Sequence, residues 1–173
     1  MVGLKKFIDG VASIYKDRDI HLSINIETQQ AVANLEGILE LGKGNINSIT
    51  VGRTDLSSSY FNDKIHPDSD FIFFLLEDLA ENISRSGMSM TVGGSLSKKS
   101  IEIFKRDLDK WPRLFNRLET RKVILPTEVM LEKEESIAEA LRFEELYILS
   151  KKEMSDLFME SEIARLTHLK MRS

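Results

Sequence analysis

The chain contains no cysteine. This absence excludes disulfide bonds, thiolate zinc sites and thiol nucleophiles together, although it does not fix the cellular compartment. Any metal ion would therefore be bound by oxygen or imidazole ligands. Long apolar runs are also lacking: none approaches the roughly 20 residues that a membrane-spanning helix needs, and the first residues lack the apolar core of a signal peptide. We therefore expect a cytoplasmic protein without a membrane partner.

An excess of positive charge is absent as well. The 24 Lys and Arg residues are scattered and are outnumbered by 28 Asp and Glu residues, which gives a formal net charge of -4. This balance predicts no nucleic-acid surface. The three histidines, His21, His66 and His168, show no spacing typical of a metal triad or a nucleophilic triad, so a structural role is favoured for all three. No glycine fingerprint follows the first expected strand, which argues against an independent Rossmann-like or flavodoxin-like domain.

What the chain does contain is an alternation of strand-like and helix-like segments. Apolar periodicity predicts helices over residues 4–14, 31–39, 71–83, 101–108, 129–143 and about 151–171, and strands over 21–26, 46–51, 88–92 and 121–125. Such alternation indicates an α/β fold with a parallel sheet, and four units make half of a TIM-type (β/α) barrel. We expect one domain over 1–173, with 151–173 as a docking or exchanged helix.

Two acidic residues close strand-like runs. Glu27 ends the run that begins at Ile24, and Asp55 ends the run that begins at Ile49. Because the carboxyl ends of parallel strands meet at one crevice, the two carboxylates are expected to converge on a cation or a substrate. An acid at such a position is also commonly a helix cap, so spacing alone leaves both interpretations open.

The same segments resemble a known family. Ile-Glu-Thr at 26–28 and Gly-Arg-Thr-Asp-Leu at 52–56 are similar to two strand ends of the HpcH/HpaI aldolase and citrate lyase β-subunit family. The resemblance implies that Glu27 and Asp55 bind one divalent metal ion, Mg²⁺ or Mn²⁺. It covers only the carboxy-terminal half of the usual barrel. In the family the other half supplies the arginine that holds the keto-acid carboxylate, and often the acid/base residue, so no catalytic residue is assigned here.

The resemblance implies a metal-dependent carbon–carbon lyase or aldolase that acts on a 2-keto acid or a citrate-lyase-like acyl substrate. Two carboxylates and a bound keto acid would complete the oxygen shell of a hard divalent cation, which would act as a Lewis acid on the keto oxygen. Backbone amides around Gly52, Arg53 and Thr54 are candidates to receive the substrate carboxylate, because glycine permits close approach. The guanidinium of Arg53 is expected either to contact an anionic substrate or to pair with a neighbouring acid.

A second functional class stays open: a non-catalytic half-barrel subunit, or a truncated module that needs a partner chain. Four parallel strands leave two open sheet edges, and open edges invite pairing with another chain. We therefore expect a homo-oligomer, or completion of the barrel by a separate amino-terminal half-barrel chain. Arg121 and Lys122 would be able to neutralise an acidic substrate at the rim, although ordinary surface charge explains them equally well.

Overall fold

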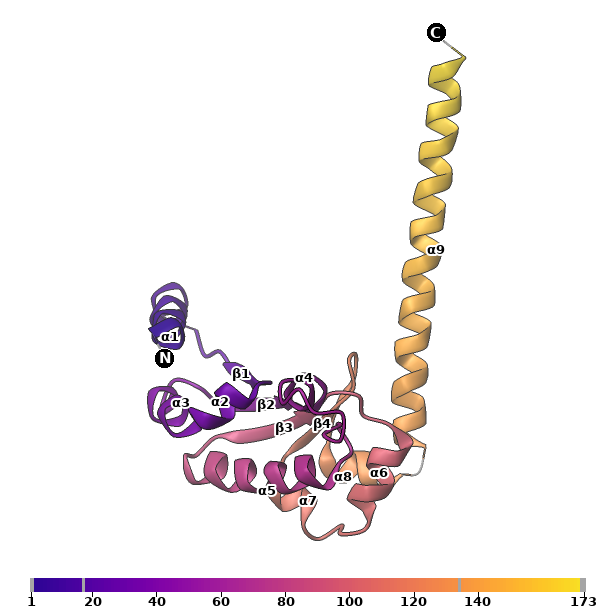
Figure 1. Cartoon of the computed structure of the whole chain (residues 1–173). Coiled ribbons are helices and arrows are strands. Elements are labelled where there is room, and N and C mark those ends of the chain that lie inside the picture. The colour runs from indigo at the N-terminus through magenta and orange to yellow at the C-terminus, as the bar shows by residue number, and fades with distance from the viewer. Residues whose placement is uncertain (1, 17, 134, 172–173) are drawn as a thin grey trace.

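The protein is described here by a computed structural model that covers residues 2–16, 18–133 and 135–171. Five strands form one sheet in the order β1 (Ser23–Ile26), β2 (Ser48–Gly52), β3 (Ser89–Gly93), β4 (Arg117–Glu119) and β5 (Ile124–Pro126). The strands from β1 to β4 are parallel, and β5 returns antiparallel to β4. The expected α/β fold with a largely parallel sheet is therefore confirmed (Figure 1).

Helices connect the parallel strands and flank the sheet at both ends of the chain. Those between parallel strands are α2 (Gln29–Ala33), α3 (Leu35–Gly42), α4 (Arg53–Ser58), α5 (Asp70–Arg85), α6 (Lys98–Lys105) and α7 (Trp111–Leu114). Helix α1 (Val2–Ile14) precedes β1, and α8 (Thr127–Glu132) and α9 (Ser136–Lys170) follow β5. The segment predicted as one helix over 31–39 is divided into α2 and α3 at Asn34, which caps both. None of the described helices is both long enough and apolar enough to cross a lipid bilayer.

The register of the strands gives the sheet two chemically different faces. One row across the sheet consists of Ile26, Val51, Val92 and Leu118, all buried in the core. The neighbouring row, one residue earlier on each strand, consists of Asn25, Thr50, Thr91 and Arg117. Because successive side chains of a strand point to opposite faces, these rows define an apolar face and a polar face. The polar face is unusual for a parallel sheet, which ordinarily has helices over both faces.

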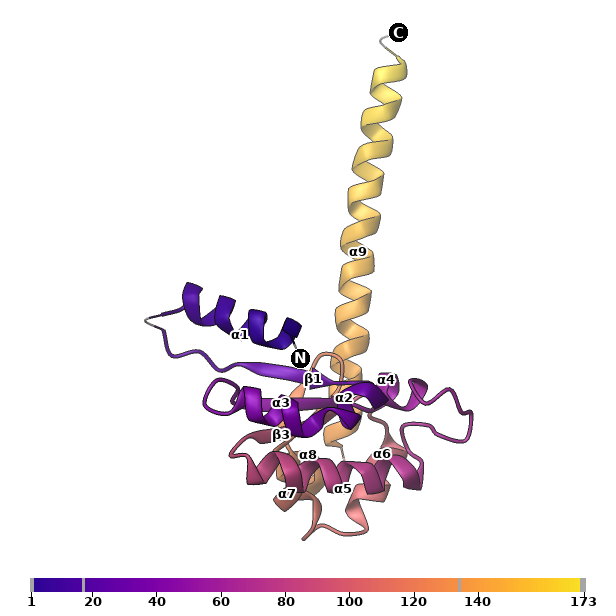
Figure 2. The same ribbon diagram turned by 60° about the vertical axis from the view of Figure 1, so that its left-hand side comes forward.

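The apolar face is covered mainly by α5. Its buried residues Ile72, Leu76, Leu79 and Ile83 recur at helical spacing and join the same core as the strands. Phe104 of α6 and Trp111 of α7 extend this core, and the centroids of their rings lie 5.3 Å apart in an edge-to-face arrangement. In Figure 2, α5, α6, α7 and α8 lie together below the sheet, so the helices that seal the core are on one side of it.

The strand predicted over 121–125 is wrong in position and in direction. The chain forms β4 four residues earlier, because Leu118 fills the core beside Val92. A tight turn then reverses the chain: Thr120 N donates to Val123 O at 2.8 Å, and Val123 N donates to Thr120 Oγ1 at 3.1 Å. The sheet therefore ends in a β4–β5 hairpin rather than in a fourth parallel strand that runs to Pro126.

The carboxy-terminal helices also differ from the prediction. Residues 129–143 and 151–171 were expected to form two helices, but α9 runs unbroken for 35 residues from Ser136 to Lys170. No glycine or proline follows Pro126, so nothing in the sequence interrupts the helix. Only Ser136, Ile137 and Ala140 of α9 are buried, and beyond its first turns the helix projects away from the sheet (Figures 1 and 2).

Candidate functional site

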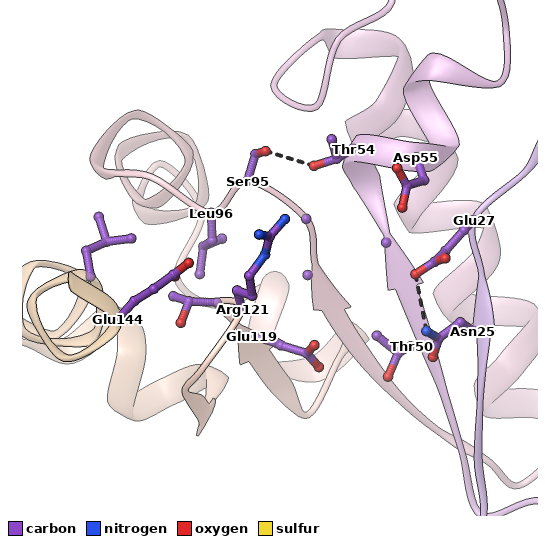
Figure 3. A pocket seen from close by; sticks show the side chains of 15 residues that line it. Asn25, Glu27, Thr50, Thr54, Asp55, Ser95, Leu96, Glu119, Arg121 and Glu144 are labelled. Atoms are coloured by element: carbon purple, nitrogen blue, oxygen red, sulfur yellow. Dashed lines mark hydrogen bonds between the residues drawn. The ribbon is translucent and has the colours of Figure 1, made fainter. Parts of the chain in front are cut away.

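A cavity of about 480 Å³ lies at the carboxyl ends of the parallel strands. Its floor is the polar face of the sheet, and its walls come from α4, the loop after β3, the β4–β5 turn and the start of α9 (Figure 3). The residues that line it are Asn25, Glu27, Thr50, Gly52, Thr54, Asp55, Gly93, Gly94, Ser95, Leu96, Glu119, Thr120, Arg121, Leu141 and Glu144. It contains both acids that the sequence singled out.

Glu27 follows the last residue of β1 and is half-buried. Asn25 Nδ2 donates a hydrogen bond to Glu27 Oε1 at 3.2 Å. A Cβ atom at Gly52 would lie 2.6 Å from the same oxygen, so the absence of a side chain there lets the carboxylate lie over the end of β2. The role of Gly52 in the cavity is thus to leave space for Glu27.

Asp55 lies in the same cavity but not on a strand. Strand β2 ends at Gly52 and α4 begins at the next residue, so Asp55 occupies the first turn of α4. Its side chain is exposed, whereas Leu56 and Ser57 beside it are buried. The expected convergence of Glu27 and Asp55 on one space is present, with the second acid carried by a helix instead of a strand end.

A third carboxylate, Glu119, was not singled out as a site residue. It is the last residue of β4, in line with Gly93 on the polar face. Burial raises the pKa of Glu119 above its ordinary value, and the negative charge of Glu27 raises it further. A sequence signal that could have found it is the apolar residue Leu118 directly before it: Leu118 faces the core, so the next side chain on the strand, that of Glu119, faces the cavity.

The side chain of Arg53 points away from the cavity. It is fully buried, and each of its five N–H groups has an acceptor: the carbonyls of Gly93, Gly94 and Pro67, the carboxylate of Asp68 and the hydroxyl of Ser100. Burial lowers the pKa of Arg53, and the Asp68 carboxylate 2.9 Å away opposes that shift. Of the two roles considered for this guanidinium, the structure shows the pairing with an acid.

Hydroxyl groups and left-handed backbone form the part of the cavity wall where α4 meets the loop after β3. Thr54 Oγ1 donates to Ser95 Oγ at 2.8 Å, which links α4 to the loop after β3. Gly94 has a φ of 84° and Ser95 a φ of 50°, a left-handed conformation that a non-glycine residue rarely adopts. A Cβ atom at Gly94 would lie 2.6 Å from the backbone nitrogens of Arg53 and Thr54, so this loop packs directly on the start of α4.

The histidines lie outside the cavity lining. His21 Nε2 is 2.8 Å from Ser48 Oγ, and His66 and His168 are exposed. Among the residues that the structure describes, no group of three or more His, Cys, Asp and Glu side chains is arranged to hold a metal ion.

Comparison with known proteins gives structural likenesses of low identity. No family model matches the chain, and no curated protein matches it. An HpcH/HpaI aldolase from Desulfitobacterium hafniense DCB-2 is similar over 66% of this chain and 40% of its own, with 16% identity and a TM-score of 0.46. A citrate lyase from Burkholderia xenovorans LB400 is similar over 68% of this chain and 39% of its own, with 8% identity and a TM-score of 0.49. The chain thus spans about two fifths of the length of either structure.

Proposed function

We propose that the cavity is the metal- and acid-binding half of a carbon–carbon lyase or aldolase site for a 2-keto acid or a citrate-lyase-like substrate. The observation that carries the proposal is the meeting of Glu27 and Asp55 in one polar cavity at the carboxyl edge of a parallel sheet. These are the two acids of the Ile-Glu-Thr and Gly-x-x-Asp-Leu segments that resemble the aldolase family.

The donor set fits a hard divalent cation. Four carboxylates line the cavity (Glu27, Asp55, Glu119 and Glu144) against a single guanidinium, that of Arg121. Burial is the main cause of the raised pKa of Glu119, and repulsion from the nearby Glu27 carboxylate adds to it. Glu27 and Asp55 would hold Mg²⁺ or Mn²⁺, with water and substrate as further ligands. Such an ion supplies Lewis acidity toward the keto oxygen and the enolate that forms from it.

Side chains around the cavity hold the Glu27 carboxylate in place and offer hydroxyl groups to a substrate. Gly52 leaves the space that Glu27 occupies, and Asn25 holds one oxygen of that carboxylate. Thr54 and Ser95 present hydroxyls that are fixed by their mutual hydrogen bond, so they are preorganised to bind a polar ligand without a new loss of rotamer freedom. Leu96 and Leu141 supply the apolar part of the wall.

The experiment is a titration of the purified chain with Mn²⁺, followed by electron paramagnetic resonance, with and without oxalate. Replacement of Glu27 by Gln and of Asp55 by Asn should each weaken Mn²⁺ binding at least about tenfold, because each removes one charged ligand. The matched control is Glu102→Gln, an exposed acid of α6 outside the cavity. Unchanged affinity in both cavity variants would contradict the metal site.

Catalytic activity is measured separately from metal binding, by proton exchange. Formation of an enolate exchanges the methyl protons of pyruvate with deuterated water, and ¹H NMR follows the loss of the methyl signal. We expect exchange that requires Mn²⁺ or Mg²⁺ and both acids. Tight metal binding without exchange would favour the second candidate, a half-barrel subunit that needs another chain. Strand β1 is one of the two outer strands of the sheet, and its outer edge pairs with no other strand of the described residues; this edge is the specific feature that favours this candidate.

A further inference from the structure

A second polar pocket, of about 350 Å³, lies at the opposite end of the sheet from the cavity. It includes Ser89, the first residue of β3, whereas the cavity includes Gly93, the last residue of the same strand. Its other walls come from the end of α5, the end of α7 and Asn116, which directly precedes β4. Because α5 and α7 lie beside each other below the sheet (Figures 1 and 2), we call this site the α5–α7 pocket.

The polar side chains of the α5–α7 pocket carry hydrogen-bond donors and no negative charge. They belong to Ser84, Ser89, Arg113 and Asn116, and no Asp or Glu is among the described residues that line the pocket. The four side chains come from α5, β3, α7 and the segment before β4. The cavity at the other end of the sheet is lined by four carboxylates. The two ends of the sheet therefore differ in charge, and the α5–α7 pocket is the end that attracts anions.

The guanidinium of Arg113 is exposed and not paired. Neither an ion pair nor a side-chain hydrogen bond of Arg113 is found in the described part of the chain. Its backbone is held in place, since Arg113 N donates to Lys110 O at 3.1 Å. Trp111 and Phe115, on either side of it in the chain, are buried in the core. An unpaired guanidinium on a fixed backbone offers five N–H donors in one plane to an oxyanion.

Asn116 presents its amide N–H₂ group in a fixed direction. Asn116 Oδ1 accepts a hydrogen bond from Met90 N at 3.3 Å, and Asn116 N donates to Met90 O at 2.9 Å. Among the described residues no acceptor is found for Asn116 Nδ2 or for Ser84 Oγ. Ser89 Oγ makes only a long contact, 3.4 Å, with Asn47 O. These groups are thus free to donate to a ligand in the pocket.

The carbonyl groups at the end of α5 do not make this pocket a cation site. Ser84 O accepts a hydrogen bond from Gly87 N at 2.9 Å, and Ile83 O accepts one from Met88 N at 3.3 Å. Gly87 has a φ of 77°, so these two bonds form the Schellman motif that commonly ends a helix. The last carbonyls of α5 are therefore satisfied within the chain, and the groups that stay open in the pocket are donors.

We propose that the α5–α7 pocket binds a phosphate group, with Arg113 as its charged ligand and Ser84, Ser89 and Asn116 as neutral donors. A tetrahedral oxyanion is favoured over a planar carboxylate, because the donors belong to four separate segments and approach the ligand from different sides. The phosphate is either the free ion or part of a phosphate monoester. This inference goes beyond the proposed function and does not depend on it.

The test is a titration of the chain with inorganic phosphate, without metal, followed by ¹H–¹⁵N NMR of the backbone amides and the arginine Nε–H groups. Arg113→Gln should weaken binding at least about tenfold, because it removes a hydrogen bond between charged groups. Asn116→Asp keeps the oxygen that accepts from Met90 N and replaces the N–H₂ donor by a negative oxygen, so it should weaken binding as well. A parallel titration with glycerol 3-phosphate distinguishes the sources: tighter binding than phosphate identifies a monoester, and weaker binding identifies the free ion.

Arg106→Gln is the matched control. Arg106 is an exposed arginine at the end of α6, outside the lining of the α5–α7 pocket, and its replacement should leave the affinity for phosphate unchanged. Equal weakening by Arg106→Gln and Arg113→Gln would overturn the inference, because phosphate would then be attracted by surface charge in general. A lack of saturable shifts, or acetate binding as tight as phosphate binding, would overturn it too. Glu27→Gln, which tests the metal site, should leave phosphate binding unchanged, so the two proposals can fail independently.

Discussion

The fold disfavours ionisation of one cavity carboxyl, that of Glu119. Its pKa is raised, first by burial and then by the charge of Glu27. The folded state therefore holds the Glu119 proton more tightly than the unfolded state does. The stability that this contributes is present at low pH and is lost as the pH rises through the raised pKa. At neutral pH the ionised Glu119 is a destabilising group, which is a cost typical of a functional site.

Glu119→Gln should accordingly raise the free energy of unfolding at pH 7 relative to the wild type. This gain should disappear at about pH 4, where the side chain at position 119 is neutral in the wild type and in the variant alike. Urea unfolding at the two pH values measures it through the midpoint. Glu27→Gln should produce a smaller gain, because it removes only the second cause of the shift. Glu102→Gln, on the exposed face of α6, is the control. A gain from Glu119→Gln of equal size at both pH values would contradict this account.

Arg53 connects several elements around the cavity. Its guanidinium, at the start of α4, donates to the carbonyls of Gly93 and Gly94 at the end of β3 and to Asp68 before α5. Asp68 also accepts a hydrogen bond from Ser100 Oγ of α6 at 2.7 Å. The loop that carries Ser95 is therefore held by a buried ion pair on the far side of the cavity wall.

Asp68→Ala should destabilise the protein by about 3 kcal/mol, because it leaves the buried guanidinium of Arg53 without its counter-charge. Chemical denaturation gives the change in the free energy of unfolding. Asp63→Ala, at an exposed carboxylate of the same connection between α4 and α5, should change it by less than about 0.5 kcal/mol. Similar small changes for both variants would show that the pair with Asp68 is not the support of this region.

Most of the helices and strands could be predicted from the sequence, and those that could not have physical causes. Helical spacing identified α5, and apolar runs identified β2 and β3, because each buries one continuous face. Strand β4 is three residues long, too short for a period to be recognised, and the apolar run that follows it belongs to the edge strand β5. The partner of Arg53 was beyond prediction because Asp68 reaches it only when the chain folds back.

Two of the four carboxylates in the cavity could be predicted from the sequence, because the strands before them are recognisable. Glu27 and Asp55 each follow a strand that the sequence reveals, so their meeting could be anticipated from the parallel order of β1 and β2. Glu119 and Arg121 depend on the hairpin that the sequence did not reveal. Glu144 enters the cavity from α9, a contact between segments far apart in the chain that no local pattern encodes.

At the scale of the whole molecule, α9 exposes many apolar side chains to solvent. Along α9, Phe143, Tyr147, Met154 and Leu157 fall at helical spacing on one side, and Ile148, Met159 and Leu166 on another. All of them are exposed. A helix with apolar side chains around its circumference is normally buried between neighbours. We therefore keep the expectation that this helix docks on another chain, and propose a second copy as the partner.

Association should depend on the far half of α9, which is outside the folded body. Leu157 and Phe158 are 60% and 65% exposed, so their burial between two chains removes apolar area from water and favours assembly. Replacing both by Glu should lower the mass in solution to that of one chain, as measured by sedimentation over a range of concentrations. The helix itself should persist, because Glu is a good helix former.

Leu108→Glu provides the comparison for that measurement. Leu108 is 53% exposed and lies after α6, far along the chain from α9. Its replacement by Glu should therefore leave the assembly intact. Circular dichroism must show the same helix content in all variants. A wild-type chain that sediments as a monomer at every concentration would contradict self-association. The exposed face of α9 would then have to be matched to a different partner, such as the half-barrel chain that would close the sheet at β1.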